Sequence, residues 1–229
     1  MRSWAERTVV IGGHSRNIGK TGVMAGLIYG LAPLGWTAVK ITQYGHGICS
    51  LDGEPCGCAP SEHSYVLTEE NDPEGRSDTC RFLAAGARRS LWLRVRQGQL
   101  AEAFPALEEW LDRSGWVMVE SNSILELIDP RVYIAVMDSA TRDFKASARK
   151  FLGRADAFVL TGSRFNARAW PEIGPQTLEG KPRFAVSSNR FHSEKLCRFV
   201  RQKLGPARAE APAGPLSRAP GQKEHLWRH

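Results

Sequence analysis

The pattern of hydrophobic and polar positions predicts strands that alternate with helices. Short apolar runs rich in β-branched residues are typical of strands buried on both faces, and they recur between stretches with helical spacing. The expected strands are residues 8–12, 37–42, 90–95, 116–120, 132–138, 157–161 and 183–188. The expected helices are residues 20–34, 77–87, 100–113, 144–153 and 193–204. This alternation indicates a three-layer, Rossmann-like α/β fold with a mostly parallel sheet of roughly seven strands.

Two segments do not follow this alternation. Residues 43–75 are rich in Gly, Pro, Cys, Ser and acidic residues and look too irregular for one regular element, so we expect a functional or partly disordered loop. Residues 205–229 have little apolar content, which is typical of a disordered tail. The sequence therefore predicts one α/β domain over residues 1–204, with an inserted loop at 43–75, followed by a C-terminal tail at 205–229.

Composition narrows the class of protein. Hydrophobic residues make up 42% of 229, enough for a sizeable core, and no apolar run is long enough to cross a bilayer. The first residues lack the apolar region of a secretory signal and the five cysteines are an odd number, so we expect a cytoplasmic protein whose cysteines are reduced thiols or metal ligands. The formal net charge of +7 suits a phosphate-bearing ligand, whereas no basic helix with interleaved aromatic residues indicates nucleic acid.

The strongest chemical signal is the segment Val-Val-Ile-Gly-Gly-His-Ser-Arg-Asn-Ile-Gly-Lys-Thr at residues 9–21, which follows a strand and opens a helix. In such a loop, backbone N–H groups and the helix N-terminus surround the phosphates of a nucleotide. Lys20 is expected to reach the β- and γ-phosphates, and the Thr21 hydroxyl to bind Mg²⁺. The expected nucleotide contacts are Gly13, His14, Ser15, Arg16, Asn17, Ile18, Gly19, Lys20, Thr21 and Gly22.

The spacing of this loop differs from the common form, because five residues separate Gly13 from Gly19 and His14 stands where glycine is usual. In length it resembles the Gly-Thr-x-x-x-Val-Gly-Lys-Thr loop of dethiobiotin synthetase, within the dimeric class of P-loop NTPases that includes the MinD-like ATPases. Leu31, Gly35 and Lys40 stand in corresponding places. The resemblance implies a homodimer, and an ATP-dependent ligase or phosphotransferase acting on a small carboxylated or phosphorylated substrate.

A second resemblance lies in residues 77–87, Ser-Asp-Thr-Cys-Arg-Phe-Leu-Ala-Ala-Gly-Ala. This segment is similar to the Asp-Ser/Thr-x-Arg-x-x-x-Ala-Gly-Ala segment of molybdopterin-guanine dinucleotide biosynthesis adaptor (MobB-like) proteins. It implies an adaptor that hydrolyses ATP or GTP slowly and presents a cofactor precursor or a metal to a partner enzyme. The residues carried over are Lys40, Asp78, Arg81 and Glu120. Because residues 120–124, Glu-Ser-Asn-Ser-Ile, depart from the Glu-Gly-Ala-Gly-Gly of dethiobiotin synthetase, the sequence favours the adaptor.

Phosphoryl chemistry needs a carboxylate that faces the metal, usually at the end of a buried strand. Glu120 ends the apolar run 117–119 and is expected to hold Mg²⁺ with Thr21 and Asp78. The proposed catalytic residues are Lys20, Lys40 and Asp78. Structural alternatives remain for three of these residues, since Glu120 and Asp78 would also serve as caps of a turn and a helix, and Lys40 as a surface lysine.

Other polar residues follow later strands. Asp138 ends one of these strands, and Arg142, Asp143 and Lys145 come soon after it, either lining a substrate or forming a solvated loop. Base recognition is expected from residues 161–163 and 187–189, with Asn189 the preferred contact. No Asn-Lys-x-Asp motif occurs, so the sequence leaves the base open between adenine and guanine.

The cysteines and histidines of residues 43–75 form a candidate Zn²⁺ site. Its proposed ligands are Cys49, Cys56, Cys58 and His63, with His46 as a substitute ligand. The alternatives are thiols that only pack, or a redox-active pair formed by Cys56 and Cys58. Cys80 and Cys197 lie on expected helices, where small buried side chains are common.

Overall fold

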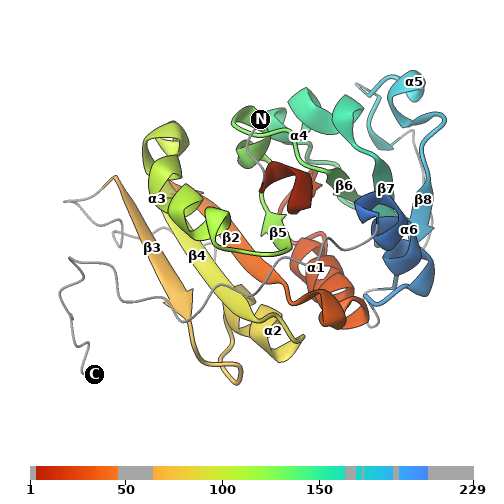
Figure 1. Cartoon of the computed structure of the whole chain (residues 1–229). Helices are drawn as coiled ribbons and strands as arrows, with labels where there is room; N and C mark the ends of the chain where they lie inside the picture. The colour runs from red at the N-terminus through yellow and green to blue at the C-terminus, as the bar shows by residue number, and fades with distance from the viewer. Residues whose placement is uncertain (1–3, 46–63, 163–168, 172, 188–190, 206–229) are drawn as a thin grey trace.

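The computed structural model describes residues 4–45, 64–162, 169–171, 173–187 and 191–205. Within these ranges, eight strands form one sheet in the order β3-β4-β2-β5-β1-β6-β7-β8, with β3 and β8 at the two edges (Figure 1). The strands are β1 (Thr8–Gly13), β2 (Thr37–Tyr44), β3 (Tyr65–Glu70), β4 (Arg89–Arg96), β5 (Val117–Glu120), β6 (Val132–Met137), β7 (Ala157–Leu160) and β8 (Arg183–Ala185). Neighbouring strands are parallel except β3 and β4.

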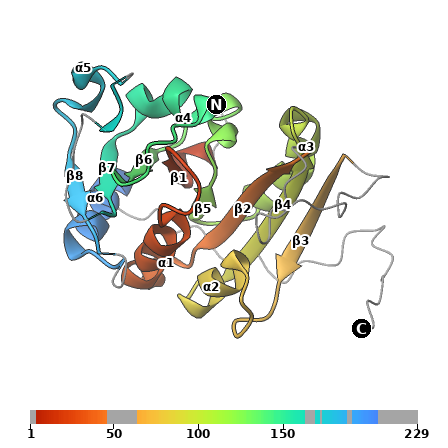
Figure 2. The ribbon, with the colours of Figure 1, turned by 180° about the vertical axis from the view of Figure 1, so that it is seen from behind.

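Helices cover both faces of this sheet. The α-helices are α1 (Lys20–Gly30), α2 (Asp78–Ala84), α3 (Leu100–Asp112), α4 (Ala146–Phe151), α5 (Pro175–Leu178) and α6 (Glu194–Leu204). Short 3-10 helices are η1 (Ala5–Arg7), η2 (Ala32–Leu34), η3 (Ser123–Glu126) and η4 (Leu152–Arg154). Apolar side chains of α1, α2 and α6 join the core on one face, and those of α3, α4 and α5 join the core on the other. Figure 2 shows α1 and α2 next to each other along the sheet.

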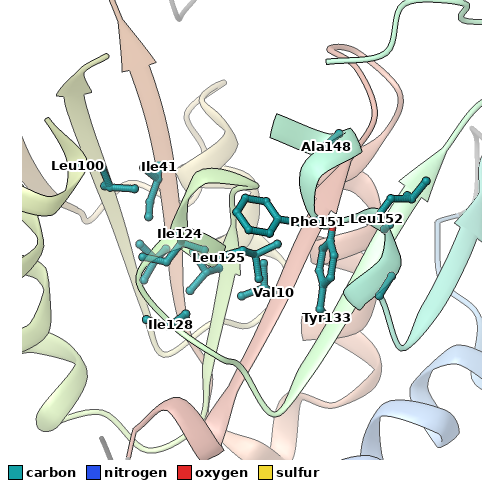
Figure 3. Close-up of a cluster of buried hydrophobic side chains, with 14 of the residues drawn as sticks. Val10, Ile41, Leu100, Ile124, Leu125, Ile128, Tyr133, Ala148, Phe151 and Leu152 are labelled. Atoms are coloured by element: carbon teal, nitrogen blue, oxygen red, sulfur yellow. The ribbon is translucent and has the colours of Figure 1, made fainter. Parts of the chain in front are cut away.

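The central strands are buried on both faces, as their unbroken apolar runs predict. Val9 and Ile11 of β1 belong to the core beneath α1, whereas Val10 belongs to the opposite core. Figure 3 shows this second core, in which Ile124 of η3 and Phe151 of α4 lie over the sheet near Val10. Burial of each such side chain contributes about 1.5–3 kcal/mol, so the strand carrying the phosphate loop is firmly anchored.

The three-layer fold with a mostly parallel sheet is confirmed, but the expectation that residues 43–75 hold no regular element is wrong for β3. This strand is antiparallel to β4 at the edge of the sheet, and its residues are half-buried or exposed. Only Tyr65 and Leu67 pack against the core, while Thr68, Glu69 and Glu70 are polar. An edge strand buries only one face, so its sequence lacks the long apolar run of a central strand, and the sheet has eight strands instead of seven.

Two further boundaries differ from the expectation. The first helix ends at Gly30 instead of residue 34, because Pro33 follows in η2 and Gly35 adopts a left-handed conformation with φ of 65°. Helix α5 was not predicted, since four residues carry too little periodicity. Among the described residues, no helix is long and apolar enough to span a bilayer. Residues 206–229, the expected tail, lie outside the described ranges.

Candidate nucleotide site

The phosphate loop lies where the order of the strands reverses. Strand β1 is flanked by β5 and β6, with Ile11 beside Glu120 and Gly13 beside Val136. From β1 the chain first builds the β2 side of the sheet and later, through β6, the opposite side. Open α/β sheets bind ligands at the carboxyl ends of the strands at such a reversal. The loop after β1 therefore occupies the position at which this architecture binds ligands.

Asn122 fixes the start of the loop through two hydrogen bonds to Gly13. The Gly13 N–H donates to Asn122 Oδ1 at 2.9 Å, and Asn122 Nδ2 donates to the Gly13 carbonyl at 2.8 Å. A Cβ atom on Gly12 would lie 2.2 Å from Asn122 Oδ1, so glycine is required there for the close approach. Sequence reasoning missed Asn122, because its partner lies 109 residues away and no spacing motif connects them.

The end of the loop leaves the first turn of α1 open. Gly19 is the N-cap of α1 with φ of 89°, and it has no side chain that would cap the helix. The first turn contains no acidic residue. On the far side, Thr161 Oγ1 donates to the Ile18 carbonyl at 2.9 Å and holds the loop against the end of β7. A helix N-terminus of this kind favours a bound anion.

Lys20 extends its side chain across the loop. Its Nζ donates to the Ser15 carbonyl at 2.6 Å. Burial lowers the pKa of Lys20 from 10.5 to about 8, and the positive charges of Lys145 and Lys40 add to this effect, although Glu120 and Asp78 oppose it. A buried ammonium group with a weakened hold on its proton gains stability from a nearby anion such as a phosphate.

The strand-end carboxylate joins Thr21 to Lys40. Thr21 Oγ1 donates to Glu120 Oε2 at 2.8 Å, and Lys40 Nζ donates to Glu120 Oε1 at 2.9 Å and also to Asp78 Oδ2. Burial alone would lower the pKa of Lys40, but the charges of Glu120 and Asp78 and the hydrogen bonds to them outweigh it and raise that pKa. Four residues from four elements therefore form one connected polar group at the edge of the sheet.

These contacts test the structural alternatives, in which Glu120 and Asp78 only cap a turn and a helix and Lys40 is a surface lysine. The N-cap of α2 is Ser77, whose Oγ accepts the Cys80 N–H at 3.1 Å, so Asp78 is not needed as the cap. The carboxylate of Glu120 bonds to Thr21 and Lys40 instead of capping a turn. Lys40 is not a surface lysine, since only 15% of its side chain is exposed.

The donor set fits Mg²⁺. Oxygen ligands are what this ion prefers, and Thr21 offers a hydroxyl while Glu120 and Asp78 offer carboxylates. This set contains two carboxylates, and the described residues contain no group of three or more His, Cys, Asp or Glu side chains that could hold a metal.

The proposed zinc ligands Cys49, Cys56, Cys58 and His63, together with His46, lie outside the described ranges. Cys80 and Cys197 are free thiols buried in helices, as expected.

His14 anchors the loop to the segment after β6. Its Nδ1 lies 2.8 Å from the Asp143 carbonyl, and its Nε2 accepts the Asp138 N–H at 3.0 Å, a pattern that requires the neutral ring with its proton on Nδ1. Burial lowers the pKa of His14, which favours this neutral form. The ring is almost fully buried against Phe144 and Trp170, so a nucleotide contact of His14 has to come from its backbone.

The same segment makes two more bonds to the loop. Ser15 Oγ donates to Asp143 Oδ2 at 2.6 Å, and the Lys145 N–H donates to the His14 carbonyl at 2.8 Å. Burial and the charge of Arg16 lower the pKa of Lys145. Arg142 is exposed, and Asp138 Oδ1 accepts the Ala140 N–H at 3.0 Å within a turn. Asp143 and Lys145 therefore lie beside the phosphate loop, whereas Arg142 makes no such bond to the loop among the described residues.

The expected base contacts are only partly described. Thr161 and Gly162 follow β7, and a Cβ atom on Gly162 would lie 2.7 Å from Asp138 Oδ1, so the loops after β6 and β7 are closely packed. Ser187 is exposed after β8. Asn189 lies outside the described ranges, as do Ser163 and Ser188.

Together, the parallel sheet, the glycine-containing loop between β1 and α1, and the acid on the neighbouring strand define the fold of a P-loop NTPase. No protein-family model matches the sequence, and no curated protein matches it either. One similar solved structure is HypB from Helicobacter pylori in complex with nickel, with 16% identity, a TM-score of 0.48, and coverage of 87% of this chain and 88% of that one. The fold assignment rests on the sheet order and the loop, and not on this likeness.

Proposed function

We propose that the protein binds Mg²⁺ with ATP or GTP on the loop from Gly13 to Thr21, hydrolyses the nucleotide slowly, and acts as an adaptor or delivery factor in cofactor biosynthesis. One observation carries the nucleotide site. Lys20 is half-buried and reaches across the loop to the Ser15 carbonyl, while the Thr21 hydroxyl bonds to Glu120 on the adjacent strand. These are the two kinds of group that a nucleotide bound with magnesium requires.

Different residues of the chain would bind the phosphates and the Mg²⁺ ion. Lys20 would exchange its bond to the Ser15 carbonyl for the phosphate oxygens, and the N-terminus of α1 would stabilise their charge. Thr21, Glu120 and Asp78 would hold Mg²⁺, which when bound neutralises the charge that develops on the transferred phosphoryl group. Lys40 keeps its proton, because the two carboxylates raise its pKa, and so supplies a second positive charge beside the site.

Slow hydrolysis is supported by the ion pairs of Lys40. Its ammonium group binds both Asp78 and Glu120, so these bonds have to rearrange before either carboxylate can serve Mg²⁺ fully. A partner protein that shifts α2 would speed up this rearrangement. The similarity of residues 77–87 to the MobB-like adaptors supports the same role.

Equilibrium titration with fluorescent ATP and GTP analogues, with and without Mg²⁺, tests this proposal. Lys20→Ala should weaken binding at least about 100-fold, since two charge-assisted hydrogen bonds contribute roughly 1.5–3 kcal/mol each. The matched control is Lys150→Ala, which removes an exposed lysine paired with Glu126 and should leave the affinity unchanged. Wild-type protein that binds neither analogue at millimolar concentration would rule out the nucleotide site.

A second candidate is an ATP-dependent ligase or phosphotransferase acting on a small carboxylated substrate. It is favoured by the position of Lys40, which lies next to the proposed metal ligands and would neutralise a substrate carboxylate. The two functions differ in what accelerates hydrolysis. A panel of small carboxylated metabolites should raise release of orthophosphate if the protein is such an enzyme, whereas only a co-purifying partner protein should do so if it is an adaptor.

A further inference from the structure

The sheet face that extends away from Lys40 has an unusual composition. The side chains that share this face on β2 and β4 are polar, aromatic or cationic: Lys40, Thr42, Tyr44, Trp92, Arg94 and Arg96. The register places Lys40 beside Trp92, and Thr42 beside Arg94. The alternate residues Ile41, Leu93 and Val95 belong to the opposite, apolar core. Three positive charges therefore line one half of a sheet face next to the proposed nucleotide site.

Helix α2 covers only the first half of this face. Phe82 of α2 is fully buried, and so are Ala38 and Ser90 on the strands beneath it. Further along the same strands, Trp92 and Arg94 remain partly exposed, whereas Tyr44 at the end of β2 is buried. The boundary falls at Asp78, where α2 begins and where Lys40 is paired. The half of the face that α2 does not cover is thus continuous with the polar group at the edge of the sheet.

Trp92 and Arg94 form a stacked pair on this second half of the face. The guanidinium carbon of Arg94 lies 4.7 Å from the centre of the Trp92 ring. Trp92 Nε1 donates to Thr42 Oγ1 at 2.9 Å, which holds the indole toward β2. The Nε atom of Arg94 is buried and has no hydrogen-bond partner among the described residues. Burial also lowers the pKa of Arg94, with a smaller opposing effect from Tyr44.

Arg89 on the same strand provides an internal comparison. Its guanidinium carbon lies 4.5 Å from the ring centre of Trp110, so it stacks in the same way on the opposite face. Arg89 Nε, however, also donates to Glu69 Oε1 at 2.7 Å. Arg94 has no such acidic partner in the described ranges. A partly buried guanidinium without an anion is costly, and the missing anion is what a ligand would supply.

We propose that the face formed by Thr42, Trp92 and Arg94 binds a small planar anion, such as an aromatic carboxylate or an aryl phosphate. Arg94 would bind the anionic group, and the ring would stack on the flat surface of the Trp92–Arg94 pair. Lys40 lies two residues before Thr42 on β2, which is about 7 Å along the strand. An aromatic carboxylate or aryl phosphate bound at Arg94 therefore reaches the nucleotide site. The role of this ligand as the second substrate or the cargo rests on the proposed function, but its binding does not require nucleotide hydrolysis.

The test is calorimetric titration of the full chain with 2-naphthoate, which is planar and anionic. It should bind at least about tenfold more tightly than 2-naphthalenemethanol, which lacks the charge, and than cyclohexanecarboxylate, which lacks the plane. Arg94→Gln should weaken binding of 2-naphthoate at least about tenfold, since it removes a charge-assisted hydrogen bond. Arg89→Gln is the matched control, because it removes the other stacked arginine, and its affinity should equal that of the wild type.

Further variants test whether a loss of affinity for 2-naphthoate reflects the binding face itself or a failure of the variant to fold. Trp92→Phe should stay within about threefold of the wild type, whereas Trp92→Leu should lose the preference for planar anions. If Arg94→Gln lowers the melting temperature strongly, Arg94→Lys, which keeps the charge without the plane, should bind 2-naphthoate more weakly than the wild type while remaining folded. Equal affinity in wild type and both Arg94 variants would overturn the proposal.

The Lys20→Ala variant separates this proposal from the nucleotide site. It should lose nucleotide binding but bind 2-naphthoate like the wild type. If it instead loses 2-naphthoate binding while Arg94→Gln retains it, the anion occupies the phosphate loop and the inference is wrong. A twelve-residue oligothymidylate that binds more tightly than 2-naphthoate in an Arg94-dependent manner would also overturn it, because the face would then serve nucleic acid.

Discussion

The centre and the flank of the sheet's carboxyl edge are built in opposite ways. At the centre, where β5, β1 and β6 meet, the charged and polar side chains already have hydrogen-bond partners. Lys20 and Asn122 donate to backbone carbonyls of the loop, and Thr21 donates to the carboxylate of Glu120. On the flank formed by β2, β4 and β3, Arg94 stacks on Trp92 but its Nε has no partner among the described residues. A ligand at the centre would replace existing hydrogen bonds with new ones. A ligand on the flank would instead supply the hydrogen-bond partner that Arg94 Nε lacks among the described residues.

Replacing Glu120 with Gln should give the largest effect among the tests of this contrast. The substitution removes the charge that joins Thr21 to Lys40, and should raise the Mg²⁺ concentration for half-maximal nucleotide hydrolysis roughly 10- to 100-fold. Hydrolysis assays over a range of Mg²⁺ concentrations measure this shift. Glu126→Gln, at an exposed ion pair with Lys150, is the matched control and should change nothing. An unchanged Mg²⁺ dependence in Glu120→Gln would remove Glu120 from the metal site.

The pH dependence of nucleotide binding should follow Lys20. Its pKa of about 8 lies below the ordinary 10.5, so Lys20 is protonated below about pH 8 and loses its charge above it. The affinity for nucleotide should therefore fall about twofold from pH 7 to 8, where half of Lys20 is deprotonated, and then up to about tenfold for each further pH unit. Titrations at pH 7, 8, 9 and 10 measure this effect. The same slope in Lys20→Ala would show that a different group is responsible.

Asn122→Ala should destabilise the central loop. It removes both hydrogen bonds to Gly13 and leaves two backbone groups without partners, which costs about 1–3 kcal/mol of unfolding free energy. Urea denaturation measures the loss. Asn122→Asp keeps the acceptor for the Gly13 N–H but not the donor to the Gly13 carbonyl, and should lie between wild type and Asn122→Ala. Equal stability of all three proteins would show that these two bonds do not hold the loop.

The smallest effects on stability should come from the serine caps of two helices, one beside the proposed metal site and one away from it. Ser77 caps α2 on the flank and Ser193 caps α6, where its Oγ accepts the Leu196 N–H at 3.4 Å. Replacing either serine with Ala should cost about 1 kcal/mol in unfolding free energy. Only Ser77→Ala should also shift the Mg²⁺ dependence of hydrolysis, because Asp78 directly follows that cap. Equal Mg²⁺ dependence in the two variants would separate Asp78 from the metal site.

Much of the fold could be predicted because its signals are local. The apolar runs of β1, β5 and β6 and the periodicity of α3 each lie within a few residues, and these elements appear where the pattern predicts them. β3 escaped prediction because an edge strand buries one face only. The segment from Gly13 to Thr21 was recognisable for a similar reason, since one short stretch contains the glycines, the lysine and the threonine.

The sequence by itself therefore determined the α/β class, the loop after β1, and the candidates Lys20, Thr21 and Glu120. Only the tertiary structure decided how they are connected. Lys40 meets Glu120 across 80 residues and Asp78 across 38, and Asn122 meets Gly13 across 109. Arg89 pairs with Glu69, whereas Arg94 has no acidic partner among the described residues, and this difference likewise depends on which strands are neighbours. Strand order and register follow from the packing of the whole core, and no local pattern encodes them.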